Sequence, residues 1–162
     1  MVVRHSKFAL YMDTSALVKL FVEEDGNDLV SALAEGQMGA DVLLVSRLGY
    51  TEATVSLSRM VHLGRISAAD LPHLLGSLDD YWDQSIQEVD LTEEVLEDAR
   101  QLAQRFPLRT YDAIHLASAR EARRLLRGVF DGEVHFLAFD TALLNAAQMI
   151  GFKIPKGAGL GR

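Results

Sequence analysis

Four acidic residues stand at the points where this sequence predicts strands to end or helices to begin. Two of them follow short apolar runs, at 8–12 and 134–138, and the other two fall early in predicted helices. A single carboxylate in such a position is most often a helix cap, a first-turn acid that complements the helix dipole, or a solvated side chain. The alternative is that the four converge and perform chemistry together. They are Asp13, Glu52, Asp112 and Asp140.

The elements that must position these acids alternate along the chain. Apolar, β-branched runs predict strands, and apolar residues at helical spacing predict helices between them. The predicted strands are 8–12, 42–45, 85–89, 134–138 and a last edge strand at 152–154. The predicted helices are 14–22, 29–34, 48–63, 70–82, 92–106, 110–126 and 140–150. This alternation favours an α/β fold with a mostly parallel sheet and helices on both of its faces.

Length and composition indicate one globular domain over 1–162. The chain is 49% apolar and 24% charged, which is ordinary for a soluble domain. We expect a core over about 8–154 and a loose tail at 155–162. The absence of cysteine excludes a disulfide framework and Cys-ligated zinc. No signal segment or run of about 20 apolar residues is recognised, so we expect a cytoplasmic protein that does not contact a membrane.

Parallel strands would bring the four acids to one edge of the sheet, where open α/β sheets bind ligands. Two like charges about 4 Å apart repel by on the order of 4 kcal/mol at an effective dielectric near 20, so the cluster must hold protons or cations. Carboxylate oxygens favour Mg²⁺ or Mn²⁺ over zinc, and such an ion activates water and neutralises a phosphodiester. The net charge of −7 argues against a nucleic-acid coat protein, but it is compatible with a metal-dependent nuclease.

Ordered motifs around these acids resemble those of a known family. They are DTSAL at 13–17, SRL at 46–48 leading to Glu52, RTYDAIHLA at 109–117, and Phe139 and Asp140 with Leu143 and Ala147. In this order they look like the motifs of PIN-domain ribonucleases and, more narrowly, of the VapC-type toxins of bacterial type II toxin–antitoxin pairs. The motif at 109–117 is the most specific of them, and the resemblance covers about 8–154.

The resemblance implies a three-layer α/β/α sandwich with Mg²⁺- or Mn²⁺-dependent endoribonuclease activity on RNA. It also implies inhibition by a cognate antitoxin protein and a homodimer within a larger toxin–antitoxin complex. Carried over by position, Asp13, Glu52, Asp112 and Asp140 are the expected catalytic acids. Of these, Asp13 and Asp112 are expected to hold the principal ion, with Glu52 and Asp140 as further candidate ligands.

Five more residues are candidates for supporting the acids. The resemblance implies that Thr14 or Ser15 assists the metal site. His115 lies one helical turn after the third acid and is expected to pack there or to give polar support. Arg47 and Arg109 are close to the acids in sequence, and we expect them to contact phosphate.

Alternatives to a nuclease depend on single positions. Ala138 stands where the family commonly has Thr or Ser, which keeps open a PIN fold that binds RNA or protein without cutting. A Mg²⁺-binding receiver-like signalling domain would need a second acid at Met12 and a buried lysine, for which Lys153 is the candidate. A haloacid-type phosphatase would need a second aspartate two residues after Asp13, where Ser15 stands.

The segment after the first acid carries more apolar side chains than one buried face of a helix would take up. It carries Leu17, Leu20, Phe21 and Val22. We expect some of these side chains to pack inward and the rest to offer a groove for a helical segment of an antitoxin.

Overall fold

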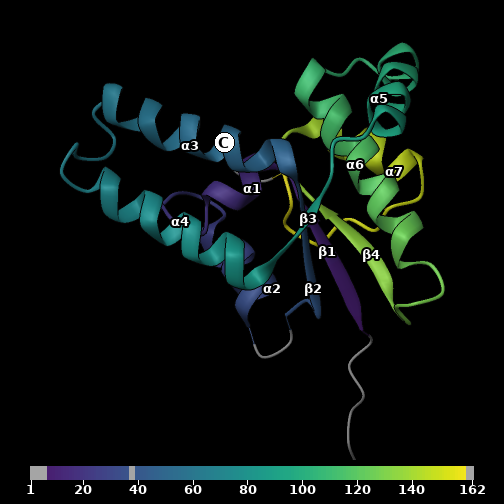
Figure 1. The fold of residues 1–162 in the computed structure, drawn as a ribbon, viewed down its shortest axis with the longest axis horizontal. Coiled ribbons are helices and arrows are strands. Elements are labelled where there is room, and N and C mark those ends of the chain that lie inside the picture. Colours follow the sequence, from purple (N-terminus) through teal and green to yellow (C-terminus); the bar gives the residue numbers. More distant parts are fainter. Residues whose placement is uncertain (1–6, 37–38, 160–162) are drawn as a thin grey trace, which may run out of the picture.

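The structure, a computed structural model, describes residues 7–36 and 39–159. At its centre lies a four-stranded sheet in which every neighbouring pair of strands is parallel, in the order β3-β2-β1-β4 (Figure 1). The strands are β1 (Phe8–Met12), β2 (Val42–Ser46), β3 (Ile86–Val89) and β4 (Glu133–Leu137). The predicted parallel α/β sheet is therefore confirmed.

Helices connect all four strands and follow the last one. They are α1 (Thr14–Val18), α2 (Asn27–Glu35), α3 (Arg47–His62), α4 (Leu71–Ser85), α5 (Glu93–Arg105), α6 (Thr110–Leu126) and α7 (Thr141–Met149). Several begin where the sequence predicts. The Thr92 side chain, for example, accepts the Val95 N–H at 3.3 Å and caps α5. None of the described helices has the length and apolar character that crossing a membrane requires.

The two faces of the sheet bury separate cores, which gives the three-layer α/β/α sandwich. Alternate residues of β1 face opposite ways: Ala9 and Tyr11 pack with α5, α6 and α7, whereas Leu10 and Met12 pack with α1 to α4. Figure 1 shows α5, α6 and α7 gathered on one side of the sheet and the other helices on the opposite side. The sheet is thus covered on both faces, as expected for parallel strands.

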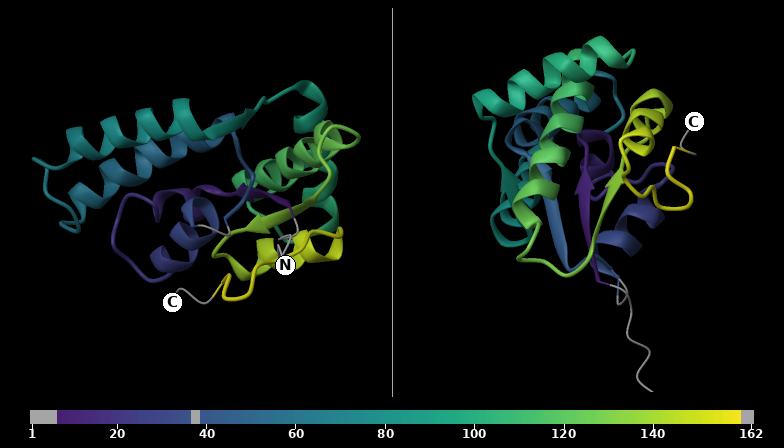
Figure 2. Two further views of the ribbon diagram at one scale, coloured as in Figure 1. Left: turned by 90° about the horizontal axis from the view of Figure 1, so that it is seen from below. Right: turned by 90° about the vertical axis from the view of Figure 1, so that its right-hand side faces the viewer.

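Helices α3 and α4 form a long antiparallel pair that extends well beyond the sheet. Both Figure 1 and the left view of Figure 2 show them running side by side away from the strands. Leu57 of α3 and Leu78 of α4 are fully buried in the core that these helices share with α1 and α2. The pair is anchored to the sheet at its inner end, where α3 begins directly after β2.

Three local predictions differ from the structure. Helix α1 ends at Val18, not at residue 22, and Lys19, Leu20 and Phe21 continue in a tighter turn with bonds to carbonyls three residues back. The predicted last strand, 152–154, is wrong as a strand: it makes one isolated parallel bridge to β4. The described part of the tail is not loose throughout, because Ala158 packs against both cores; residues 160–162 lie outside the described chain.

Replacing Phe136 by alanine tests the packing beneath the site. Phe136 is fully buried in β4 and its ring stacks on Tyr11 with centroids 5.4 Å apart. The cavity left behind is expected to lower the free energy of unfolding by about 3–5 kcal/mol, measured by urea denaturation. Val129→Ala, at a position 80% exposed, serves as the control and should change it by no more than about 0.5 kcal/mol. A loss near zero for Phe136→Ala would contradict this core.

Candidate active site

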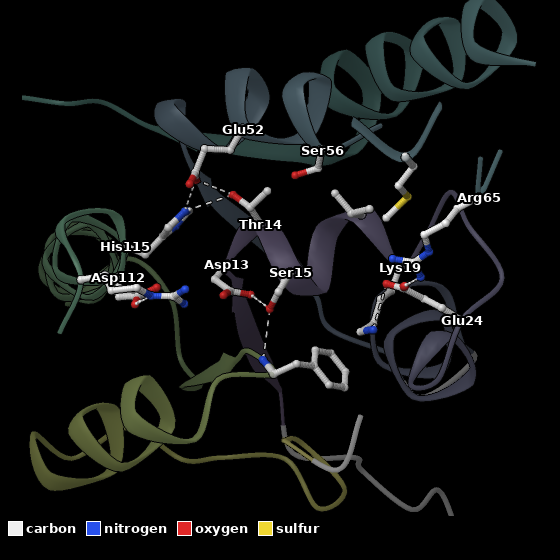
Figure 3. A pocket seen from close by; sticks show the side chains of 14 residues that line it. Asp13, Thr14, Ser15, Lys19, Glu24, Glu52, Ser56, Arg65, Asp112 and His115 are labelled. Carbon is white, nitrogen blue, oxygen red and sulfur yellow. Dashed lines mark hydrogen bonds and ion pairs between the residues drawn. The ribbon is translucent and has the colours of Figure 1, made fainter. Parts of the chain in front are cut away.

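A pocket of about 350 Å³ opens where β1 and β2 give way to α1 and α3 (Figure 3). Three of the four predicted acids line it: Asp13, Glu52 and Asp112. They come from three separate segments of the chain, which meet because parallel strands end at the same edge. The structure therefore brings together most of the predicted acidic cluster.

Asp13 is the most deeply buried of these acids, with 6% of its surface exposed. Its backbone N–H still donates to the carbonyl of Leu137 on β4, so the residue ends the sheet, and its Oδ1 caps α1 by accepting the Ala16 N–H at 3.0 Å. The Ser15 hydroxyl also donates to Oδ1, at 2.7 Å. Within the described chain Oδ2 has no hydrogen-bond partner, so one carboxylate oxygen remains available to a ligand.

The environment of Asp13 disfavours its charge. Desolvation by burial raises the pKa of the carboxyl, and the neighbouring Asp112 carboxylate raises it further. His115 and the bonds from Ser15 and Ala16 act in the opposite direction without cancelling this effect. A buried carboxylate with a raised pKa gains free energy from any cation that binds to it.

Glu52 is held by two side chains from elements distant in sequence. Its Oε2 accepts the Thr14 hydroxyl at 2.5 Å and lies 2.6 Å from His115 Nε2 (Figure 3). Burial by itself raises the pKa of Glu52, but the bonds from His115 and Thr14 outweigh it and the pKa is lowered. This carboxylate is therefore kept ionised, and its Oε1 has no partner among the residues described.

A buried tyrosine fixes the orientation of His115. The Tyr11 hydroxyl lies 2.9 Å from His115 Nδ1, and both residues are almost fully buried. Because the Glu52 carboxylate can only accept, Nε2 of a neutral His115 carries the proton and Nδ1 accepts from Tyr11. Gly49 of α3 lets that helix pack closely on β2, since a Cβ there would lie 2.6 Å from Val45 Cγ1.

Arg109 connects the third acid to the fourth. Its Nε donates to Asp112 Oδ2 at 2.8 Å, and its Nη2 lies 3.4 Å from Asp140 Oδ2. Asp140 does not line the pocket; its Oδ1 caps α7 by accepting the Leu143 N–H at 2.9 Å. The fourth acid thus contacts the cluster only through Arg109.

The opposite end of the pocket is formed by a Lys–Glu–Arg cluster. Lys19, only 8% exposed, donates to Glu24 Oε1 at 2.9 Å, and Arg65 pairs with Glu24 Oε2 at 2.9 Å (Figure 3). The Lys19 ammonium also lies 4.5 Å from the centre of the Phe139 ring. Gly26, at φ 94°, presses against that ring, and a side chain there would collide with it.

Two sequence predictions lie away from the pocket. Arg47, at the start of α3, pairs with acids at the end of β3: it lies 3.6 Å from Glu88, in the strand, and 3.5 Å from Asp90, directly after it. Lys153 pairs with Glu133 at 2.6 Å and is exposed at the opposite end of β4 from the acids. The buried lysine required by a receiver-like domain is therefore not supplied by Lys153.

The donor set suits a hard divalent ion. The available atoms are carboxylate oxygens, which Mg²⁺ and Mn²⁺ prefer. Within the described chain no three acidic or histidine side chains already surround one point as metal ligands. Mg²⁺ typically keeps several waters and takes one or two protein carboxylates, and Asp13 and Asp112 are two carboxylates of this pocket that could hold such an ion.

Sequence reasoning did not identify Tyr11, Lys19, Glu24 and Arg65 as residues of the site. For Tyr11 a signal existed, because a tyrosine in the middle of a buried strand needs a partner for its hydroxyl. For the cluster at the far end no signal existed. Its members belong to the α1–α2 and α3–α4 connections, and only the fold brings them together.

The fold is that of a PIN domain, and the family model described as "PIN domain" matches residues 10–126. The match ends before Asp140. Ribonuclease VapC45 from Mycobacterium tuberculosis is 37% identical over 110 residues, which cover 68% of this chain and 74% of that protein. Ribonuclease VapC47 from the same species is 31% identical over 144 residues, covering 88% and 93%. The chain belongs to the PIN-domain family and, within it, to the VapC type.

A solved structure shares the fold. A chain of a toxin–antitoxin complex from Klebsiella pneumoniae superposes with a TM-score of 0.57, covering 82% of this chain and 87% of that one. Only 17% of the aligned residues are identical, so this likeness concerns the fold alone. It agrees with the predicted three-layer architecture.

Replacing Asp13 by asparagine is expected to stabilise the metal-free protein at neutral pH. The pKa of Asp13 is higher in the folded protein than in the unfolded chain, where it is about 3.9. The free energy of unfolding therefore falls as the pH rises from the unfolded-state pKa through the folded-state pKa. Asparagine keeps the Oδ1 acceptor and removes that cost. In urea denaturation with EDTA, the gain in the free energy of unfolding should grow with pH and vanish in acid.

Asp80→Asn, at an exposed position of α4, is the matched control, because it also removes one negative charge but the carboxylate that it removes is not buried. It should show no comparable pH-dependent gain. A loss of stability for Asp13→Asn at pH 8 would contradict the description of Asp13 as a buried carboxylate with a raised pKa.

Proposed function

We propose that this protein is a Mg²⁺- or Mn²⁺-dependent endoribonuclease, the toxin of a toxin–antitoxin pair that a cognate antitoxin holds inactive. The observation that carries the proposal is the pocket in which Asp13, Glu52 and Asp112 converge, with Asp13 buried and one of its oxygens without a hydrogen-bond partner among the described residues. The relatives named as VapC ribonucleases support the same activity.

Each of the four acids has a defined part in this proposal. Asp13, positioned by Ser15 and the end of β1, and Asp112, in the first turn of α6, hold the ion. Glu52, fixed and kept ionised by Thr14 and His115, orients the attacking water. Asp140 is a supporting residue, because it reaches the cluster only through Arg109.

Hydrolysis requires that water attack the phosphorus and that the bond to the leaving oxygen break. A bound Mg²⁺ or Mn²⁺ supplies a more acidic water and neutralises charge on the phosphate. Arg109, whose side chain is 77% exposed, can leave its carboxylates and contact the substrate phosphate. When water attacks, the bond from phosphorus to the 3′ oxygen breaks and that oxygen takes a proton from solvent, so the products carry a 5′-phosphate and a 3′-hydroxyl. Attack by the RNA's own 2′-hydroxyl instead expels the 5′ oxygen and leaves a 2′,3′-cyclic phosphate.

Cleavage of a mixed RNA pool by the partner-free protein tests the activity. Cutting is expected with Mg²⁺ or Mn²⁺ and not with EDTA, with 5′-phosphate ends on the products. Loss of a residue that orients a metal ligand costs about 10–100-fold. Asp13→Asn removes a proposed ligand itself and should lower the rate by at least about 100-fold, whereas Asp140→Asn acts only through Arg109 and should lower it by about 10-fold. Products are read by gel electrophoresis and by end-specific labelling.

Two results would contradict the proposal. Cyclic-phosphate ends would exclude water as the nucleophile. Absence of cutting by folded, partner-free protein with either ion would favour a PIN fold that binds RNA without cleaving it. Two features favour this second candidate. Ala138 stands where the family commonly has a hydroxyl residue, and Asp140 does not line the pocket.

The antitoxin is proposed to bind the hollow beside the α1–α2 connection. Leu17 is fully buried and unavailable, but Phe21 and Val22 line a cavity of about 550 Å³ together with Met60 and Leu74. Charged side chains, among them Glu23, Arg65 and Asp70, line the same hollow, so the proposed occupant is an amphipathic helix whose hydrophobic side faces these apolar residues. We further propose that the toxin forms a homodimer within a larger complex and acts on RNA in the cytoplasm.

Phe21→Asp tests this surface. A charge among the apolar side chains of this hollow should weaken binding of the proposed antitoxin, the protein encoded by the adjacent gene, by at least about 10-fold, since burying an unpaired charge is costly. Binding is measured by co-purification and calorimetry, with Leu125→Ala on exposed α6 as the control. Unchanged binding, or recovery of no partner by wild-type protein, would contradict it.

A further inference from the structure

An aromatic side chain stands exposed next to the acids. Tyr111 lies in the first turn of α6, immediately before Asp112, and 56% of its surface is exposed. It lines a second hollow of about 430 Å³, together with Glu52, Arg109, Thr110 and Asp112. The exposed ring of Tyr111 is therefore available to contact a ligand in this hollow.

This second hollow adjoins the acid-lined pocket. The two share Glu52, Arg109 and Asp112 as lining residues, so the acids lie where the hollows meet. Tyr111 belongs to one hollow, and Lys19 and Arg65 belong to the other. A chain molecule that crosses the acids would therefore pass an aromatic surface on one side and cationic side chains on the other.

Packing does not account for the exposure of Tyr111. The other exposed tyrosine of the described chain, Tyr50, donates its hydroxyl to Asp79 at 2.6 Å and packs edge-on against Trp82. Tyr111 has neither kind of contact to a described residue: no hydrogen bond to its hydroxyl and no aromatic neighbour. Its ring is also absent from both cores.

We infer that Tyr111 is a stacking platform for an unpaired RNA base adjacent to the bond that is cut. The inference deepens the proposed function and rests on it. Stacking of a base on an aromatic ring tolerates any sequence, because every base has a π-face. Arg109, in the same hollow, is placed to contact the phosphate of the stacked nucleotide.

The platform predicts a preference for single-stranded RNA. In a duplex the bases stack on one another and their faces are closed to a side chain. A nucleotide with a free base can lay that base on Tyr111 while its phosphate reaches the shared acids. The site then selects unpaired segments such as loops and ends rather than helices.

Binding without cleavage isolates this role. Wild-type protein and variants are titrated with a short unstructured RNA of mixed sequence in EDTA and in Ca²⁺, and binding is followed by fluorescence anisotropy. Tyr111→Ala should weaken binding by about 5- to 100-fold, the loss expected for one stacked base. Tyr111→Phe, which keeps the ring, should bind near the wild-type value.

A tryptophan at the same position gives a direct signal. The chain has one native tryptophan, Trp82, which is buried. Tyr111→Trp should therefore add emission that the single-stranded RNA quenches and the same sequence in a duplex does not. Leu125→Ala is the matched control, because Leu125 lies in the same helix and is 55% exposed; it should leave RNA binding unchanged.

The outcomes separate this inference from the proposed function. Binding that depends on the ring, in a protein that never cuts RNA, would support the platform and overturn the nuclease. Asp13-dependent cutting with RNA binding unaltered in Tyr111→Ala would overturn the platform. It would equally be overturned if wild-type protein bound no RNA, or if Tyr111→Ala weakened binding of the protein partner alone.

Discussion

The site depends on holding one carboxylate almost out of water at the end of the central strand. Asp13 follows β1, caps α1 and lines the pocket, and one of its carboxylate oxygens has no hydrogen-bond partner in the described chain, so the same side chain both ends the strand and is available to a ligand. Its burial opposes its charge. The packing of β1 in both cores offsets that cost, because its side chains are buried on both faces of the sheet.

The second acid is controlled in the opposite way. Glu52 is kept charged by donors that reach it from α1 and α6, and His115 is in turn oriented by Tyr11 from within the sheet. Two neighbouring carboxylates with pKa values displaced in opposite directions can take different parts in a reaction. The buried chain from Tyr11 to Glu52 therefore links the packing of one core to the chemistry of the pocket.

Much of this arrangement could be predicted from sequence, because it follows from local patterns. Apolar runs that end in an acid defined β1 and the position of Asp13, and strand–helix alternation gave the parallel sheet. The predictions that differ from the structure concern the directions of two side chains. Arg47 begins a correctly predicted helix, yet its guanidinium turns toward carboxylates at the end of β3, about forty residues away in sequence. Asp140 was expected among the acids, but it caps α7 and does not line the pocket.

The cations around the pocket have a consequence for how it meets a polyanion. Lys19 and Arg65 are both paired with Glu24, and Arg109 is paired with Asp112 and Asp140. An arriving phosphate must therefore exchange places with a protein carboxylate, which then attracts cations from solution. Such an exchange offsets the counterion release that normally drives binding of nucleic acids. Association with RNA at this pocket should accordingly vary little with salt concentration, unlike that of a basic nucleic-acid-binding surface.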